Sequence, residues 1–63
     1  MAGVPDRIVI LPGHLFFVEL KATGKKPTKL QRYVAKIIRS LGFAVYFPDS
    51  IEKVDEILVN YEI

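Results

Sequence analysis

Two short apolar segments separated by a turn signal constrain the fold of this chain more than any other feature. Residues 7–11 and 15–20 are rich in β-branched and aromatic residues, which favour strands. Pro12, Gly13 and His14 lie between these segments and are typical of a turn. We therefore predict an antiparallel β-hairpin. Because both segments carry apolar residues on both sides, we expect both faces of the sheet to be covered, either by this chain or, on one face, by material that this chain does not contain.

The remainder of the chain predicts a helix, a strand and a second helix. Thr28 can cap a helix over about residues 29–41, which ends at Gly42. Residues 43–47 predict a third strand, which a helical crossover would place parallel to its neighbour. Asp49 or Ser50 can cap a second helix over about residues 51–60. The predicted fold class is α/β, a single domain over residues 1–63 in the order ββαβα with a mixed sheet.

Each predicted helix has one apolar side, and the first also has a basic side. We expect the first helix to bury Leu30, Tyr33, Val34, Ile37, Ile38 and Leu41, and the second to bury Ile51, Val54, Ile57 and Leu58. The basic side of the first helix consists of Lys29, Arg32, Lys36 and Arg39. Such a side is most often only a solvated surface, and the alternative is a surface that binds phosphates.

The length and the lack of cysteine indicate that a small core needs support. A domain of 63 residues buries only about 60% of the surface that its unfolded chain exposes. The chain has no cysteine, which excludes disulfides and cysteine zinc sites, so we expect a partner subunit. The longest apolar runs, residues 8–11 and 15–18, are too short to span a bilayer, and residues 1–3 carry no signal-peptide pattern. We expect a cytoplasmic protein without a membrane partner.

The net charge of +2 conceals a strong segregation of charge along the chain. Residues 1–41 hold eight cations and two anions, whereas residues 42–63 hold one cation and five anions. The two anions of the first part are Asp6 and Glu19, which lie in or beside its most apolar segments. This placement makes the two acids the strongest candidates for a functional site.

The geometry of a hairpin decides whether these acids meet. Glu19 and Lys21 are two residues apart, so both side chains point to one face of the sheet and Leu20 points to the other. A two-residue loop of Gly13 and His14 would set Asp6 opposite Lys21, and a four-residue loop over residues 11–14 would set it opposite Glu19. A three-residue loop without a bulge would send Asp6 to the other face.

Two neighbouring carboxylates repel each other unless a cation lies between them. Mg²⁺ prefers oxygen ligands and is usually held by one or two carboxylates plus water and phosphate oxygens, and the Leu20 carbonyl is a further possible ligand. Such an ion can polarise a scissile phosphate and lower the pKa of a bound water. Lys21 could then position that water or neutralise the developing negative charge.

Three motifs in sequence order resemble a known nuclease pattern. Gly3-Val4-Pro5-Asp6, then Glu19-Leu20-Lys21, and then Gln31 in the following helix resemble the PD-(D/E)xK nucleases in the form of the virus-type replication-repair nuclease (VRR-NUC) domain. The resemblance runs from Gly3 to about Leu58. It implies Asp6 and Glu19 as metal ligands, Lys21 as the catalytic lysine, Gln31 as a helix residue that completes the site, and Mg²⁺ or Mn²⁺ as the cofactor.

The resemblance also implies a substrate and a partner. Family members cleave DNA, often branched structures such as Holliday junctions or flaps, and the standalone bacterial and phage members are described as dimers. We therefore expect a bacterial or phage endonuclease that acts as a homodimer. The exposed cations nearest to Lys21 are the expected contacts to the DNA backbone: Lys25, Lys26, Lys29 and Arg32.

One departure from the family keeps other interpretations open. Family members usually carry, before the GxPD motif, a helix with a further acidic residue and another strand, and this chain begins almost at the motif. Either a second chain supplies the missing face, or the activity is weak or absent. One alternative is a non-catalytic DNA-binding module that retains the fold. Another is a structural dimerisation domain in which Asp6, Glu19 and Lys21 form a buried ion network.

Overall fold

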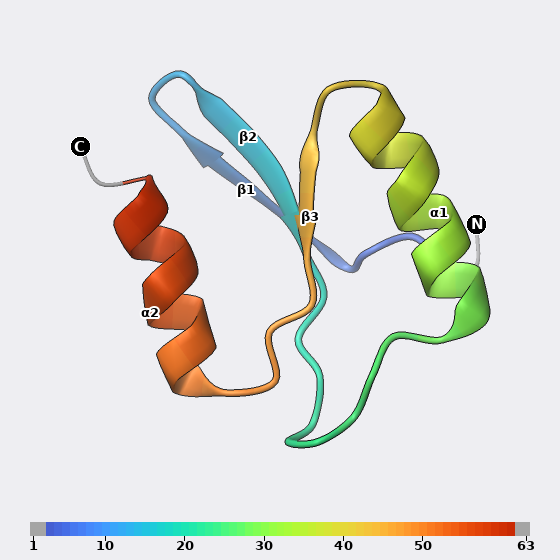
Figure 1. Cartoon of the computed structure of the whole chain (residues 1–63). Helices are drawn as coiled ribbons and strands as arrows, with labels where there is room; N and C mark the ends of the chain where they lie inside the picture. The colour runs from blue at the N-terminus through green and yellow to red at the C-terminus, as the bar shows by residue number, and fades with distance from the viewer. Residues whose placement is uncertain (1–2, 62–63) are drawn as a thin grey trace.

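The computed structural model describes residues 3–61 and has the predicted order of elements, ββαβα. The strands β1 (Arg7–Leu11), β2 (His14–Val18) and β3 (Ala44–Tyr46) form one sheet in the order β1-β2-β3. β2 is antiparallel to β1 and parallel to β3, as predicted. The helices α1 (Lys29–Ser40) and α2 (Ile51–Asn60) lie on opposite sides of the sheet (Figure 1).

The hairpin turn consists of Pro12 and Gly13, and not of Gly13 and His14, which was one of the alternatives that the sequence left open. Leu11 pairs with His14, so His14 is the first residue of β2. Gly13 has a φ of 75°, which the second central position of a type II turn requires, and proline suits the first position. The resulting register is the one that the four-residue loop also predicts, in which Asp6 comes opposite Glu19.

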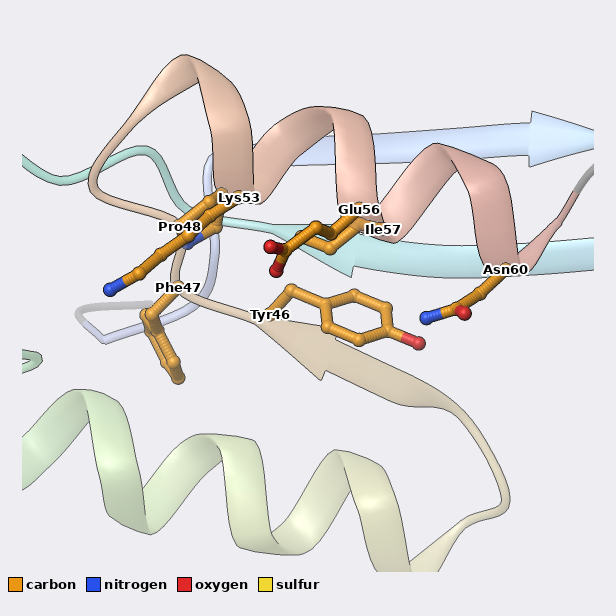
Figure 2. Close-up of a pocket in the computed structure, with 7 residues that line it drawn as sticks. All are labelled: Tyr46, Phe47, Pro48, Lys53, Glu56, Ile57 and Asn60. Atoms are coloured by element: carbon orange, nitrogen blue, oxygen red, sulfur yellow. The ribbon is translucent and has the colours of Figure 1, made fainter.

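The pairing assigns the sheet residues to two faces. Phe16 lies on the α2 face, where its ring stacks on Tyr61 at 4.3 Å between centroids and meets Tyr46 edge-on. Phe17 lies on the α1 face and contacts Phe43 edge-on. Figure 2 shows the same alternation in the chain after β3, because Tyr46 extends along α2 whereas Phe47 points toward α1. The buried apolar core consists of Phe16, Val18, Val34, Ala35 and Val45.

α1 packs against β3 and begins with a capping box. The Thr28 hydroxyl accepts a hydrogen bond from the Gln31 N–H, and the Gln31 side chain accepts one from the Thr28 N–H. Only part of the predicted apolar side of α1 is buried, because the helix contacts β3 and leaves the hairpin uncovered. The prediction is wrong for Leu30, Tyr33, Ile37 and Leu41, which are between 44% and 69% exposed.

α2 is attached more loosely than α1. Ser50 caps its N-terminus by accepting a hydrogen bond from the Lys53 N–H. None of its residues is buried; Ile51 and Leu58 are exposed, which contradicts the prediction that both face inward. At the other end the Tyr61 and Tyr46 hydroxyls are 2.7 Å apart and share a hydrogen bond.

The α1 face of the hairpin remains open. Ile8 is 59% exposed, Ile10 is 73% exposed and Leu15 is 38% exposed, so this chain does not itself cover this face of the hairpin. The cause is the position of α1, which lies over β3 and not over β1. Within residues 3–61, no helix has the length and apolar character needed to cross a membrane.

Candidate active site

The carboxyl end of β2 positions two of the predicted site residues. The Glu19 N–H donates to the Tyr46 carbonyl at 3.0 Å, and the Lys21 N–H donates to the Pro48 carbonyl at 2.9 Å. The extended ladder between the two strands therefore continues past β2. Because alternate residues of an extended strand share a face, Glu19 and Lys21 both lie on the α1 face, as predicted. The Leu20 side chain lies on the other face, where it lines a hollow of about 310 Å³ beside α2.

The backbone of Asp6 lies directly against Glu19. The Asp6 N–H donates a hydrogen bond to Glu19 Oε1 at 3.0 Å, over a separation of thirteen residues in sequence. The Asp6 carboxylate is 3.9 Å from Arg7 Nε, and both of these side chains are 61% exposed. Such an exposed ion pair contributes little free energy, so the Asp6 carboxylate can turn toward Glu19 at small cost. The hairpin thus brings the two acids together.

Lys21 is held by Gln31. Lys21 Nζ donates to Gln31 Oε1 at 2.5 Å, and the same oxygen accepts the Thr28 N–H at 2.9 Å. The capping box is by itself a sufficient structural reason for a glutamine at this position. The contact with Lys21 is additional, and it fixes the ammonium group near the N-terminus of α1.

The contacts of these residues do not form the buried ion network that a purely structural role predicts. Lys21 bonds to the neutral amide of Gln31, and the Asp6 side chain is exposed. Among the residues that the structure describes, the buried side-chain polar atoms all have a hydrogen-bond partner. Because the Asp6 side chain is exposed, the part of the site that holds the two acids is open to solvent.

The donor set fits a hard cation that keeps several waters. Asp6 and Glu19 supply carboxylate oxygens from adjacent strand positions. Since the Glu19 and Lys21 backbone groups point toward β3, the Leu20 carbonyl between them points to the opposite side, toward β1. Within the described part of the chain, no group of three or more His, Cys, Asp or Glu residues could hold a metal ion. Two carboxylates are nevertheless the usual number for Mg²⁺, which retains water and binds phosphate oxygens.

Four cations follow Lys21 in the sequence, two in the next loop and two in the first turn of α1. Lys25 and Lys26 lie in the loop after it, and Lys29 and Arg32 lie in the first turn of α1; all four side chains are exposed. The first turn of α1 contains no acidic residue. The positive end of the helix dipole adds to these charges. The loop after Lys21 and the first turn of α1 therefore carry positive charge without a neighbouring acid in that turn.

Asp49 is a residue near the site whose contacts the sequence did not predict. Sequence patterns gave it only as one of two possible helix caps, and Ser50 takes that role. Instead Asp49 binds Lys53 and the Gly24 N–H. The Lys53 ammonium, followed by the Gly24 N–H, holds the pKa of the Asp49 carboxyl below its ordinary value. The spacing of four residues between Asp49 and Lys53 was the available signal.

A second hollow, of about 270 Å³, lies between α2 and the outer edge of β3 (Figure 2). Its lining includes a lysine, a glutamate and two aromatic rings. The residues are Tyr46, Phe47, Pro48, Lys53, Glu56, Ile57 and Asn60. It shares no residue with the cluster of Asp6, Glu19, Lys21 and Gln31, so it is not part of the candidate active site.

The sequence is similar to that of a phage protein. Over 49 residues, which are 76% of this chain, it is 49% identical to "Putative nuclease p44" of Acyrthosiphon pisum secondary endosymbiont phage 1. The match covers 53% of that protein, so the chain spans about half the length of this relative. No family model matches the chain, and no solved structure matches it.

Proposed function

We propose that this chain supplies the metal-binding catalytic part of a DNA nuclease of the VRR-NUC type. One observation carries the proposal. The hairpin register sets Asp6 opposite Glu19, and Lys21 lies on the same face of the sheet as Glu19, where its ammonium group donates a hydrogen bond to Gln31. Similarity to a phage protein named as a nuclease supports the class of activity. The reaction is hydrolysis of a phosphodiester bond with Mg²⁺ or Mn²⁺.

Asp6, Glu19 and the Leu20 carbonyl are the proposed metal ligands. The metal, when bound, polarises the scissile phosphate and lowers the pKa of an attacking water. Glu19 is already held in place by the Asp6 N–H, so little ordering is needed when the cation arrives. The exposed Asp6 carboxylate would be the second carboxylate ligand.

Lys21 acts on the phosphate. Its ammonium group has three donors, of which Gln31 accepts one. The remaining donors can bind a non-bridging phosphate oxygen or the attacking water, and so stabilise the negative charge that develops in the transition state. Gln31 is thus a positioning residue that fixes the direction of these donors.

The exposed cations bind the DNA backbone. Lys25, Lys26, Lys29 and Arg32 lie where a strand that is cut beside Lys21 would continue. Such contacts orient DNA without reading its sequence, and they make the affinity fall steeply with salt. The resemblance to VRR-NUC domains favours branched DNA, such as a four-way junction or a flap, as the substrate.

A second copy of the chain is the proposed partner. The solvent-accessible surface is 4718 Å², whereas a folded protein of 7.1 kDa exposes about 4,100 Å². The difference, about 600 Å², approaches the area of about 800 Å² that each partner buries in a standard interface. The exposed Ile8 and Ile10 of β1 account for part of this surface.

The two edges of the sheet differ in a way that supports β1, and not β3, as the edge of the proposed contact. At the outer edge of β3, Arg39 Nη2 binds the Val45 carbonyl at 2.6 Å and so blocks a backbone group that a further strand would need. β1 is longer, and its residues 8–11 carry no charge. Light scattering should give the mass of a dimer, and Ile10→Lys should give a monomer. A monomeric wild-type protein would remove this part of the proposal.

The nuclease proposal is tested by incubating labelled four-way junction, flap and duplex DNA with Mg²⁺ or Mn²⁺. Lys21→Ala should lower the cleavage rate by about 100-fold or more, the usual cost of losing a transition-state donor. Glu19→Gln should abolish the Mn²⁺ binding that calorimetry measures on the wild type. Lys36→Ala is the matched control, because Lys36 is an exposed lysine of α1 that is not among the proposed DNA contacts. Cleavage by Lys21→Ala at the wild-type rate contradicts the proposal.

A non-catalytic DNA-binding module is the second candidate. Within residues 3–61, no third acidic side chain joins Asp6 and Glu19 in a possible metal site, which favours it. In that case the wild type would bind junction DNA without cutting it, and Glu19→Gln would bind equally well. The same incubations and a binding titration therefore separate the two functions.

A further inference from the structure

Two chain segments meet at the end of the sheet where the candidate active site lies. The loop of residues 22–28 follows β2, and the segment of residues 47–50 follows β3; Figure 1 shows both at the same end of the molecule. The first segment carries two of the proposed DNA contacts, Lys25 and Lys26. The second carries Asp49. The contacts between them decide how firmly these lysines are held.

Asp49 joins the two segments through both its carboxylate and its backbone. Asp49 Oδ2 accepts the Gly24 N–H at 3.2 Å, and its carbonyl accepts the Thr23 hydroxyl at 3.3 Å. The Asp49 side chain is only 19% exposed. The other carboxylate oxygen, Oδ1, lies 2.8 Å from Lys53 Nζ. Asp49 is therefore one of the more enclosed carboxylates in a chain whose other acids are mostly exposed.

The part of the loop that Asp49 holds is a tight turn. The Lys25 N–H donates to the Ala22 carbonyl at 2.8 Å, which closes a turn of four residues. Gly24 occupies the third position with a φ of 78°, a conformation that glycine adopts readily. Asp49 accepts the N–H of this glycine. The direction in which the chain leaves the turn, toward Lys25 and Lys26, is fixed by that bond.

Without the Asp49 carboxylate, the middle of the loop would keep a single bond to the segment after β3, from the Thr23 hydroxyl to the Asp49 carbonyl, and its other bonds would lie at its ends. At one end the Lys21 N–H binds the Pro48 carbonyl, and at the other end the Thr28 N–H binds Gln31. Lys25 and Lys26 lie in the middle and are exposed. Two cations on a loosely held segment lose conformational freedom when they bind phosphate, and this loss weakens binding.

We propose that Asp49 is a positioning residue that holds the loop of residues 22–28 so that Lys25 and Lys26 face the DNA backbone beside Lys21. This inference rests on the proposed nuclease function. Asp49 would act on the affinity for DNA and on KM, and not on kcat, because its hydrogen bonds and its ion pair join it to Thr23, Gly24 and Lys53.

Substitution of Asp49 distinguishes a positioning role from a purely electrostatic one, because the two roles predict opposite changes in the affinity for DNA. Asp49→Ala removes a negative charge near the bound DNA, so electrostatics alone predicts tighter binding. Loss of the turn contact predicts weaker binding instead. Asp49→Asn also removes the charge but keeps an oxygen that can accept the Gly24 N–H. Positioning therefore predicts that the alanine variant binds more weakly than the asparagine variant.

The first measurement does not depend on nuclease activity. Trypsin cuts after Lys25, and the rate reports how often the loop opens, whereas the bond between Lys26 and Pro27 is resistant. We expect Asp49→Ala to raise the cleavage rate after Lys25 by about fivefold, and Asp49→Asn to stay near the wild type. Asp55→Ala is the matched control, since Asp55 is an exposed acid on α2. An unchanged rate in Asp49→Ala overturns the inference.

The second measurement is the affinity for a fluorescein-labelled four-way junction without divalent metal, over a series of salt concentrations. Asp49→Ala should bind about threefold to tenfold more weakly than Asp49→Asn, with a smaller dependence on salt because fewer lysines engage. In cleavage assays KM should rise and kcat should stay unchanged. Equal affinity of the two variants overturns the inference. A wild type that binds the junction but never cuts it instead removes the nuclease proposal and leaves the loop result standing.

Discussion

The two helices of this protein have similar sequence patterns and are attached in different ways. Both are amphipathic, and a hydroxyl of Thr28 or Ser50 caps each N-terminus. α1 buries Val34 and Ala35 against β3, whereas α2 buries none of its residues. α2 is held at its two ends, by the contacts of Asp49 before it and of Tyr61 after it. An amphipathic pattern therefore predicts which side of a helix faces the sheet, but not how closely it packs.

The difference matters because the candidate active site lies on the more closely packed side. Glu19 and Lys21 point toward α1, and Gln31 joins Lys21 to that helix. Substitutions at the α1 side should therefore change both stability and the site. Substitutions on α2 should change stability by less and leave the site intact.

Equivalent valines on the two helices give the largest expected contrast. Val34 is 5% exposed in α1, and Val59 is 64% exposed in α2. Val34→Ala should lower the free energy of unfolding by about 2–3 kcal/mol, from lost burial and a cavity. Val59→Ala should change it by no more than about 0.5 kcal/mol. Both are valine-to-alanine changes in a helix, so helix propensity cancels in the comparison. Urea unfolding followed by circular dichroism measures both, and equal costs would contradict the difference in packing.

Two glycines with a positive φ, one beside α1 and one in the hairpin turn, give the next largest difference in the free energy of unfolding. Gly3 has a φ of 85°, and a Cβ there would lie 2.8 Å from Leu30 Cγ and 3.2 Å from the Leu30 carbonyl. Gly3→Ala should therefore cost about 2 kcal/mol, from backbone strain and from this contact with α1. Gly13 also has a positive φ, but no atom lies within 4 Å of its Cβ position. Gly13→Ala should lower the free energy of unfolding by about 1 kcal/mol, because it adds only the backbone strain of a positive φ.

Gly3→Ala should also weaken metal binding, because Gly3 begins the segment that delivers Asp6 to the sheet. Calorimetry with Mn²⁺ tests this, with Gly13→Ala as the control at the far end of the hairpin. An alanine at residue 3 that leaves both stability and Mn²⁺ affinity unchanged would show that the segment before β1 is not held by α1.

The order of the elements was predictable from the sequence because each signal is local. Apolar segments with β-branched residues gave the strands, and Thr28 gave the start of α1. The exposure of Tyr33 and Leu41 was not predictable, since it depends on how much of the sheet one helix covers. A single helix lies over β3 and leaves the hairpin open, and no pattern within the helix encodes that choice.

For the candidate site, the sequence predicted that Glu19 and Lys21 share one face of the sheet, but it did not predict the contacts of these side chains. The register of Asp6 depended on the turn, and the Pro12-Gly13 pair, which suits a type II turn, decided it. The bond of Gln31 to Lys21 depends on how α1 approaches the end of β2, so spacing alone did not indicate it, whereas the spacing of three residues between Thr28 and Gln31 is that of a capping box. The roles of these residues in catalysis, and the metal itself, remain predictions.

The smallest expected effect concerns the attachment of α2 and depends on pH. The hydrogen bond with Tyr46 raises the pKa of Tyr61 to about 12, from an ordinary value near 10. The bond favours the neutral phenol, so its stabilisation is complete below about pH 10 and is lost as the pH rises toward 12. Tyr61→Phe keeps the stack on Phe16 and removes only this bond, and it should lower the free energy of unfolding by about 1 kcal/mol at pH 8.

Urea unfolding at pH 8, 10.5 and 11.5 should show that the difference in the free energy of unfolding between wild type and Tyr61→Phe shrinks as the pH rises. A difference that stays constant to pH 11.5 would mean that the hydroxyl pair does not hold α2 to the sheet.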